Sequence, residues 1–304
     1  MQTVDVDKEI KVILNLSYSN TADARSCAKK FYYRNILGLE PRATTSALTV
    51  GSTVHECFEM YFNKSPASEV IQHIEDAYKG VTTSTEAEVE RMIIDKYTCL
   101  GIWTNYPFSE MEFEEVIPEK NFKVRLGNLL GVYLKGRVDG LVKRQGKWWI
   151  REVKTTSMDK RAFQSRASVS YQAAGYMYGV GKETNTPICG VLYDVIKRPL
   201  LRRAKHETAE DFGKRIFTDY SNPEKKEMYY DRYYSYRTEK EIAEFEKDMM
   251  ILARDLRRRI REGNWFRNTD ACFTFNSECP YKKICWEESP DPSLMDTLYE
   301  RRKV

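Results

Sequence analysis

One segment of the chain reads Tyr133-Leu-Lys-Gly-Arg-Val-Asp-Gly-Leu-Val-Lys-Arg-Gln-Gly-Lys-Trp-Trp-Ile-Arg-Glu-Val-Lys-Thr-Thr-Ser157, and it predicts two β-strands joined by a tight turn. Residues 132–143 alternate apolar and polar side chains, and residues 147–155 follow as a second strand. Gln145-Gly146 between them supplies the residue types of a hairpin turn. We therefore expect a β-hairpin here.

The predicted hairpin gathers two carboxylates and an ammonium group on one face. Alternate residues of a strand point to the same side, so Glu152 and Lys154 share a face, and the hairpin brings Asp139 beside them. Mg²⁺ and Mn²⁺ prefer carboxylates, carbonyls and water, so Asp139, Glu152 and the Val153 carbonyl predict a metal site. Lys154 would orient or deprotonate a water nucleophile, or stabilise charge on a phosphate. The competing interpretation is a solvated hairpin with an exposed Glu–Lys pair.

Two phrases of this hairpin carry a resemblance to a known family. Gly136-Arg-Val-Asp139, followed by Trp149-Ile-Arg-Glu-Val-Lys-Thr155, resembles the core of the PD-(D/E)XK nucleases. It is most similar to the RecB-like branch, which includes the AddB-type nucleases and the CRISPR adaptation exonuclease with an iron–sulfur cluster. The resemblance implies an α/β (α+β) fold, in which a central mixed β-sheet is flanked by helices. It further implies a restriction-endonuclease-like core, a helical cap and an iron–sulfur staple that joins the N- and C-terminal segments of one domain, residues 1–304.

The composition is that of a globular chain. Its 304 residues are 41% hydrophobic and 31% charged, with a formal net charge of +4, so any basic surface for nucleic acid has to be local. No apolar run approaches a membrane span, and residues 1–7 lack the layout of a signal peptide. We expect a cytoplasmic protein without a membrane partner. Its seven cysteines then favour free thiols or metal ligands over disulfides.

The N-terminal segment carries a further match. Residues 11–16 predict a short strand, and residues 17–21 offer several helix N-caps. The helix predicted over residues 25–39 resembles the opening of RecB-like nucleases, although Ala28 stands where those proteins usually have proline. A plain amphipathic helix is compatible with this interpretation, because Cys27 alone would have an additional role.

A second helix is predicted over residues 46–63. It contains Gly51-Ser-Thr-Val-His55, which resembles a histidine motif that helps relatives to bind a metal. The resemblance implies that His55 is a metal ligand, and Glu59, one turn later, could orient its ring. The alternative is a surface or packed histidine.

Residues 64–111 predict a helical cap, with helices over 68–78 and 85–103. A strand over residues 119–126 follows and resembles the glutamate-led strand that precedes the metal motif in the family. Glu119 is therefore a candidate supporting acid. Three glutamates close by in the sequence are alternatives for that position: Glu112, Glu114 and Glu115.

The catalytic core is expected over residues 120–196 and includes a helix after the hairpin. On this helix Gln172 and Tyr176 are four residues apart and share one face. They resemble the Gln-x-x-x-Tyr motif of RecB-like nucleases, whose two residues contact DNA near the scissile phosphate. The competing interpretation is a core helix with polar interruptions. Residues 188–196 then predict a buried strand of the sheet.

Residues 197–238 predict an insertion that is first basic and then rich in tyrosine and arginine. That mixture suits backbone contact and base stacking on single-stranded nucleic acid. Tyrosines that cover the edge of a core explain it equally well. A long amphipathic helix is predicted over residues 238–262, with Gly263 as its C-cap.

The C-terminal segment, residues 264–304, carries a cysteine cluster. Three cysteines within fourteen residues suit Zn²⁺ or an iron–sulfur cluster. The family supplies a fourth thiolate from the N-terminal helix, so the resemblance implies a [4Fe–4S] cluster, with Zn²⁺ as the alternative metal. Six residues rather than the usual two separate the first two C-terminal cysteines. The implied ligands are Cys27, Cys272, Cys279 and Cys285.

The sequence as a whole predicts a metal-dependent DNA nuclease, an exonuclease that acts on single strands or DNA ends in repair, recombination or replication. The chain has no Gly-Lys-Ser/Thr phosphate loop, so a helicase or recombination protein would be a separate partner. A catalytically silent DNA-binding or assembly subunit with a nuclease fold is the alternative. A zinc-stapled structural protein is a third interpretation.

Overall fold

The computed structural model of the chain describes residues 13–42, 50–79, 85–110, 112–274, 277–286 and 292–302. No helix in these ranges is both long and apolar enough to cross a membrane. The chain divides into two compact units that alternate along the sequence. The first unit comprises Met1–Thr45, Lys123–Gly136 and Ala243–Val304, and the second comprises Ser46–Phe122 and Arg137–Ile242. The single domain expected over residues 1–304 stays a prediction.

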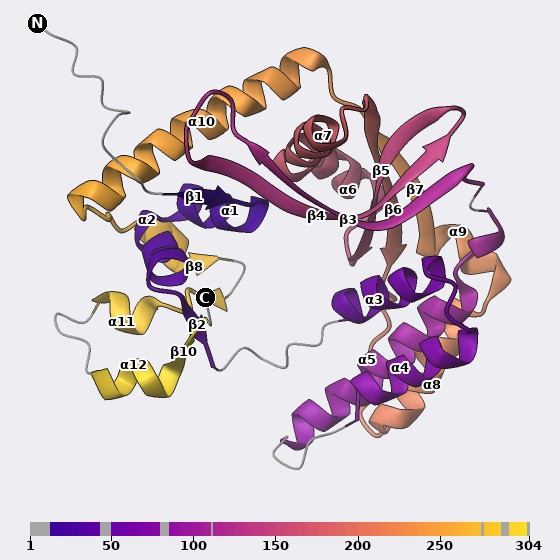
Figure 1. Ribbon diagram of the computed structural model, residues 1–304. Helices are drawn as coiled ribbons and strands as arrows, with labels where there is room; N and C mark the ends of the chain where they lie inside the picture. The colour runs from indigo at the N-terminus through magenta and orange to yellow at the C-terminus, as the bar shows by residue number, and fades with distance from the viewer. Residues whose placement is uncertain are drawn as a thin grey trace, which may run out of the picture. The chain divides into compact units, whose positions relative to one another are not determined.

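A mixed β-sheet confirms the predicted fold class (Figure 1). Its strands are hydrogen-bonded in the order β1-β4-β5-β6-β7, and β3 also pairs with β4. Strands β5 and β6 are parallel, whereas β4 with β5 and β6 with β7 are antiparallel. The strand bounds are β1 Leu14–Leu16, β3 Glu115–Arg125, β4 Val132–Arg144, β5 Lys147–Thr156, β6 Ile188–Lys197 and β7 Tyr230–Ser235.

The predicted hairpin is present. Its two strands pair antiparallel, with Gly140 opposite Arg151. Gln145 has a φ of 52° and Gly146 a φ of 69°, the left-handed backbone that a two-residue turn of this kind requires at both central positions. Alternation along the strands and turn chemistry therefore agree on one register.

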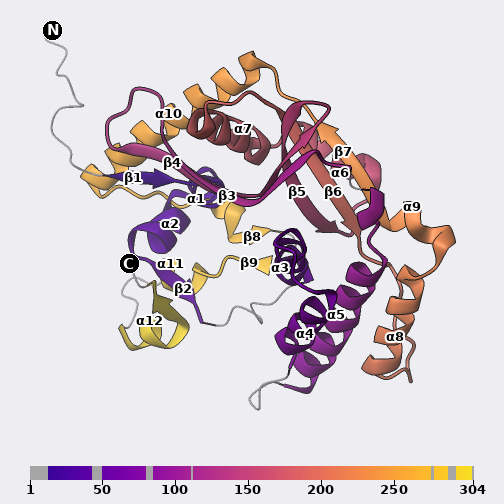
Figure 2. The same ribbon diagram turned by 45° about the vertical axis from the view of Figure 1, so that its right-hand side comes forward.

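Helices cover both faces of the sheet in the second unit (Figures 1 and 2). Helices α6 and α7 lie on one side of β5 and β6, and α3, α4, α5 and α8 lie on the other. The second group encloses an apolar core that includes Val153 of β5 and Ile196 of β6. The bounds are α3 Val50–Phe62, α4 Ala67–Ala77, α5 Glu86–Asn105, α6 Lys160–Ser168, α7 Tyr171–Thr184 and α8 Ala209–Tyr220.

Two glycines allow α5 and α8 to pack closely. A Cβ atom at Gly101 would lie 2.7 Å from the Tyr220 ring, and one at Gly213 would lie 2.4 Å from the Tyr97 ring. The helices predicted over 68–78 and 85–103 are found as α4 and α5. Helix α8 belongs to the segment predicted as an insertion. Its apolar face packs into the same core as α4 and α5.

The tyrosine-rich part of that insertion is a strand of the sheet. β7 pairs with β6, with Tyr234 opposite Leu192. The Tyr234 ring packs edge-on against Trp149, with ring centroids 5.2 Å apart, and the Tyr233 ring stacks on Tyr193 at 6.4 Å. These contacts favour the interpretation in which the tyrosines cover an edge of the core. Short helices precede the strand: η3 Pro223–Lys225 and α9 Lys226–Tyr229.

The first unit joins the two ends of the chain. Strand β2 pairs antiparallel with β10, with Glu40 opposite Glu300. The Tyr281 hydroxyl donates to the Leu39 carbonyl at 2.7 Å, and the Tyr33 hydroxyl donates to the Ile284 carbonyl at 3.2 Å. The elements involved are α1 Tyr18–Ser26, α2 Ala28–Phe31, η1 Tyr32–Ile36, β2 Leu39–Pro41, α10 Glu239–Glu262, η4 Thr269–Cys272, β8 Phe273–Thr274, β9 Ser277–Glu278, α11 Lys282–Trp286, α12 Pro292–Leu298 and β10 Tyr299–Arg301.

The prediction of one unbroken helix over residues 25–39 was wrong. Cys27 is extended, with φ −158° and ψ 121°, and it ends α1 and begins α2. Helix α1 begins after Ser17, one of the predicted N-caps, which forms a reciprocal capping box with Asn20. The long helix of residues 238–262 is confirmed as α10, and Gly263 follows it with a φ of 65°. The start of the predicted helix over residues 46–63 lies outside the described residues.

Candidate active site

The hairpin of the second unit brings the two predicted acids together. Because Gly140 lies opposite Arg151, Asp139 and Glu152 are neighbours across β4 and β5. The carboxylate oxygen Oδ2 of Asp139 accepts a hydrogen bond of 2.8 Å from the backbone N–H of Val153. This contact holds the Asp139 side chain against β5, as the predicted hairpin requires.

Glu152 is buried, with an exposed fraction of 2%. Its Oε1 lies 2.5 Å from the Lys154 ammonium, while its Oε2 has no hydrogen-bond partner among the described residues. Burial and the neighbouring Asp139 carboxylate raise the pKa of Glu152 from 4.5 to about 7. A buried carboxylate oxygen without a partner is costly. It is accounted for if a cation binds there.

His55 reaches the acids from α3. Its Nδ1 lies 3.0 Å from Oδ1 of Asp139. Burial opposes ionisation of Asp139, but the hydrogen bonds from His55 and Val153 and the charge of Lys154 outweigh it, so the pKa of Asp139 is lowered. The structure thus places His55 beside the predicted metal-binding carboxylate.

Glu119 is the glutamate of its segment that approaches these acids. Burial raises the pKa of Glu119, and Glu59 and Asp139 raise it further, although Arg137 opposes the shift. Its φ of 38° places it in the left-handed region, a strained backbone that occurs often at functional sites. Of the alternatives, Glu112 is exposed, Glu114 accepts from the Gly146 N–H at 3.0 Å and Glu115 pairs with Lys143 at 2.6 Å.

Gln172 and Tyr176 form a pair on α7. The Gln172 side-chain amide donates to the Tyr176 hydroxyl at 2.9 Å. Burial raises the pKa of Tyr176, and the charges of Glu152 and Asp139 raise it further. The two acids therefore influence the Tyr176 hydroxyl electrostatically, and Ala173 and Met177 of the same helix are buried. Both sequence interpretations of this helix are therefore compatible, because they concern different faces.

The chemistry of these groups fits a hard divalent cation. Two carboxylates and an imidazole lie together, and one buried carboxylate oxygen has no partner. In the described part of the chain, however, no three His, Cys, Asp or Glu side chains are arranged as a metal site. His55 and the Val153 N–H occupy the oxygens of Asp139, and Lys154 occupies one oxygen of Glu152.

The buried acid leads to a pH-dependence prediction. The pKa of Glu152 is about 7 in the folded chain and 4.5 ordinarily. The folded state therefore holds an extra proton between these values, and the stabilisation it gives is lost as the pH rises through 7. In EDTA, we expect the free energy of unfolding of the wild type, relative to Glu152→Gln, to fall by about 3 kcal/mol between pH 4.5 and 7.5. Urea denaturation at each pH measures it. Parallel curves would contradict the prediction, and the exposed variant Glu112→Gln serves as the control.

The four predicted cysteine ligands all belong to the first unit. The backbone N–H of Asn268 donates to Cys27 Sγ at 3.4 Å, and the Asn268 carbonyl accepts from Cys272 Sγ at 3.8 Å. Burial raises the pKa of the Cys279 thiol, and Cys272 and Cys27 raise it further. Burial and Cys27 likewise raise the pKa of the Cys285 thiol, against the effect of Arg267. Cys27 is therefore close enough to affect the thiols of Cys279 and Cys285, and Cys272 is close enough to affect that of Cys279.

These thiols are not gathered into a ligand group in the ranges that the structure describes. The donor set still suits a thiolate-bound metal, since four thiols and an N–H donor to sulfur lie in one unit. Of the remaining cysteines, Cys57 and Cys99 are buried in the core of the second unit, as packing residues are, and Cys189 is half-buried.

One buried group in the second unit was missed from the sequence. Arg151, with 1% of its surface exposed, donates from Nε to Asp194 at 2.5 Å. Arg232 donates to the other oxygen of Asp194 at 3.0 Å. The rings of Phe58 and Phe62 lie 4.6 and 4.7 Å from the Arg151 guanidinium. The available signal was an aspartate in the largely apolar strand β6 and an arginine in β5. The sequence did not specify the parallel register that brings these two strands together.

Comparisons with known proteins identify the family of the chain. A model of the PD-(D/E)XK nuclease superfamily matches residues 15–286. A search of curated protein sequences finds no match. The solved structures that resemble the chain include a protein from Eubacterium rectale that is provisionally named an exonuclease. It has 15% identity, 98% coverage of each chain and a TM-score of 0.46. The structure of SSO0001 matches with 13% identity, 74% coverage of this chain, 84% of that chain and a TM-score of 0.26. The chain belongs to the PD-(D/E)XK nuclease superfamily.

Proposed function

We propose that this chain is a metal-dependent DNA nuclease of the RecB-like branch, an exonuclease that acts on single-stranded DNA or DNA ends. The observation that carries the proposal is the buried Glu152 beside Asp139, with one oxygen that lacks a partner in the described residues. A solvated hairpin, the competing interpretation, would leave this carboxylate in water. Repair, recombination or replication in the cytoplasm is the proposed context, with a separate helicase or recombination protein as partner.

Asp139 and Glu152, with His55 and the Val153 carbonyl, would hold Mg²⁺ or Mn²⁺. Bound there, the ion would supply Lewis-acid chemistry, which lowers the pKa of water and offsets charge on a phosphate. Lys154 would orient or deprotonate the attacking water, or donate to a phosphate oxygen. Lys154 is paired with Glu152, so this ion pair must open, or Lys154 must contact Glu152 and the substrate at the same time. Gln172 and Tyr176 would position the DNA backbone. Glu119 would be a supporting acid of the site.

The second candidate is a silent DNA-binding or assembly subunit. This candidate requires that Asp139 and Glu152 have only a structural role. The geometry favours the enzyme, because a structural role does not explain an unpaired oxygen on a buried carboxylate whose pKa is raised to about 7.

The proposal is tested with one single-stranded DNA sequence in two forms, linear and covalently closed, each with an internal fluorophore. Mg²⁺, Mn²⁺ or EDTA is supplied to purified full-length protein. We expect the metal-containing reactions to degrade the linear form and spare the circle. Equal cleavage of both forms would contradict the exonuclease mode. Binding without cleavage of either form would favour the silent subunit. End labels on the linear form then give the polarity.

We further propose a [4Fe–4S] cluster on the thiolates of the first unit, with Zn²⁺ as the alternative. Support comes from the resemblance and from the convergence of the two ends of the chain, which the β2–β10 pair and the Asn268 contacts document. The role is structural: the metal would fix the N- and C-terminal segments together. The proposed ligands are Cys27, Cys272, Cys279 and Cys285.

Removal of one thiolate leads to a prediction about metal content. We expect anaerobically purified wild type to be brown with about four iron atoms per chain. Cys285→Ala should lose the colour and most of the iron, because one of the cluster's four bonds to protein is gone. Cys189→Ala, a cysteine outside the set, should keep both. Iron and zinc are measured by plasma mass spectrometry. Full iron content in Cys285→Ala would exclude that ligand, and zinc in the wild type would select the alternative metal.

A further inference from the structure

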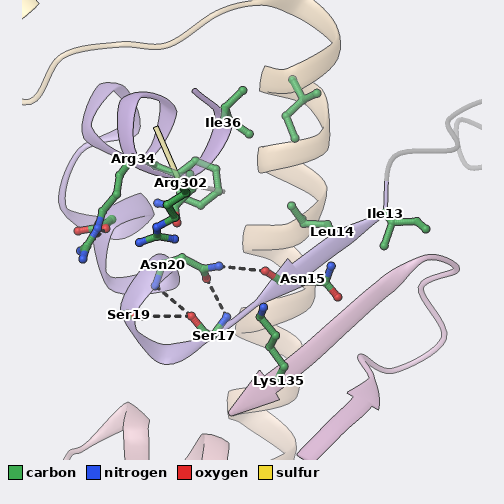
Figure 3. A pocket seen from close by; sticks show the side chains of 14 residues that line it. Ile13, Leu14, Asn15, Ser17, Ser19, Asn20, Arg34, Ile36, Lys135 and Arg302 are labelled. Carbon is green, nitrogen blue, oxygen red and sulfur yellow. Dashed lines mark hydrogen bonds and ion pairs between the residues drawn. The ribbon is translucent and has the colours of Figure 1, made fainter. Parts of the chain in front are cut away.

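The first unit contains a pocket to which the proposed catalysis assigns no role (Figure 3). Its volume is about 430 Å³, within the range of about 300–1,000 Å³ typical of small-molecule sites. Segments that are far apart in the sequence line it: β1, α1, α2, η1, β4, α10 and the residue after β10.

Two lining side chains carry a buried polar atom without a partner among the described residues. They are Oδ1 of Asn15, an acceptor, and Nδ2 of Asn35, a donor. Their surroundings are already used: the Asn20 amide donates to the Asn15 backbone carbonyl at 2.9 Å and also completes the helix cap with Ser17. Buried polar groups almost always have partners. A ligand that both donates and accepts hydrogen bonds would supply the two that are missing.

The pocket is positively charged. Arg34, Lys135 and Arg302 line it, against one carboxylate, Asp23. That carboxylate is neutralised by Lys30 at 2.9 Å and by Arg34 at 3.2 Å. Arg302 is paired with Glu40, which is not a lining residue of the pocket. Lys135 makes no ion pair within the described chain, and Figure 3 shows it on the same side of the pocket as Ser17. The free charge and the nearby hydroxyls suit an anionic group.

The remaining wall is apolar. Leu14 and Phe31 are buried, and Ile36 and Ile260 complete this surface. The hydroxyls of Ser17 and Ser19 lie 3.1 Å apart on the polar side. A ligand matched to both walls has an anionic end, hydrogen-bonding groups and a flat or apolar part. A nucleotide combines these three features in one molecule of suitable size.

We propose that this pocket binds one nucleoside monophosphate. Its phosphate would contact Lys135 and the serine hydroxyls, and its sugar or base would satisfy Asn15 and Asn35. The nucleotide is the terminal residue of a DNA strand or a released product, an assignment that rests on the proposed nuclease function. The pocket itself does not depend on that function, since its residues are distinct from the catalytic acids.

The test is calorimetric titration of the full-length chain with thymidine 5′-monophosphate in EDTA, which keeps divalent metal out of the catalytic site. Thymidine and inorganic phosphate are titrated separately as partial ligands. We expect one nucleotide per chain, with a Kd at least tenfold lower than that of either partial ligand. No binding at millimolar nucleotide, or equal binding of phosphate alone, would overturn the proposal while the nuclease test stands on its own result.

Variants locate the site. Lys135→Gln removes the unpaired charge from an exposed position, so the fold should be kept, and Asn35→Asp replaces the unpartnered donor by a carboxylate. Each should weaken nucleotide binding at least tenfold. Lys147→Gln makes the same charge change at an exposed lysine that does not line the pocket, and it should bind as the wild type does. Unchanged binding in both pocket variants would place the nucleotide elsewhere and overturn the proposal.

Oligonucleotides separate the two sources of the nucleotide. Octathymidylate with and without a 5′-phosphate is titrated into wild type and Lys135→Gln, again in EDTA. Preference for the phosphorylated strand that Lys135→Gln abolishes identifies a DNA-end site. If Lys135→Gln weakens binding of the free monophosphate but not of either oligonucleotide, the pocket binds the released product. Both results support a nucleotide site.

Discussion

Replacement of Asp194 by asparagine is expected to lower the free energy of unfolding by about 3–5 kcal/mol. Asp194 accepts hydrogen bonds from two guanidinium groups, those of Arg151 and Arg232. Arg151 is 1% exposed, so loss of the carboxylate leaves a cation in the interior without a counter-charge. Two of its neighbours are the rings of Phe58 and Phe62, which cannot replace an anion.

The measurement is urea denaturation followed by circular dichroism, with Asp231→Asn as the matched control. Asp231 lies on the adjacent strand and pairs with Lys160 at 2.8 Å, but that lysine side chain is 66% exposed. A solvated pair of this kind contributes less than about 1 kcal/mol. Equal destabilisation by the two variants would show that the burial of Arg151 has no energetic consequence. The double variant Arg151→Met/Asp194→Leu should recover part of the loss, because it removes the buried Arg151–Asp194 pair together. Arg232 then lacks its partner, but its side chain is 25% exposed to water.

Replacement of Lys154 by alanine is expected to reduce the rate of DNA cleavage by about 10²–10³-fold or more. Lys154 is the one cation in contact with the buried Glu152 carboxylate within the described residues, at 2.5 Å, and its side chain is 32% exposed. It can therefore reach both the acids and a substrate phosphate. Its removal takes away a donor for the developing charge and leaves Glu152 harder to ionise.

Single-turnover cleavage of linear DNA with excess protein measures this effect apart from product release. Lys160→Ala is the control, since Lys160 follows the same strand on α6 and is 66% exposed. It should retain cleavage within a few-fold of the wild type. A Lys154→Ala rate equal to that of Lys160→Ala would remove Lys154 from the proposed chemistry. Far-ultraviolet circular dichroism of both variants excludes unfolding as the cause.

The hairpin could be predicted from the sequence because its information is local. Alternation fixes which residues share a face, and Gln145-Gly146 fixes the turn, so the neighbourhood of Asp139, Glu152 and Lys154 followed directly. The placement of His55 and Tyr176 relied on motif resemblance. The structure brings His55 to Asp139 and couples Tyr176 to Glu152, although their catalytic roles remain proposals.

Features that depend on contacts between distant segments could not be predicted in the same way. The burial of Arg151 depends on the parallel register of β5 with β6, which leaves no local pattern. The break between α1 and α2 falls at Cys27, and no helix-breaking residue in the sequence marks it. The tyrosine-rich strand β7 was ambiguous because tyrosine suits a sheet edge and a nucleic-acid surface equally well. The pocket of the first unit is assembled from residues between positions 13 and 302.

The central claim is that Asp139 and Glu152 form a metal-dependent site for DNA hydrolysis. The most direct measurement is cleavage of end-labelled single-stranded DNA during titration of metal-free protein with Mn²⁺, with wild type and Glu152→Gln side by side. The account predicts that wild-type cleavage rises with Mn²⁺, stops on addition of EDTA and is absent from folded Glu152→Gln. Cleavage that persists in EDTA, or that proceeds in Glu152→Gln at the wild-type rate, would contradict it.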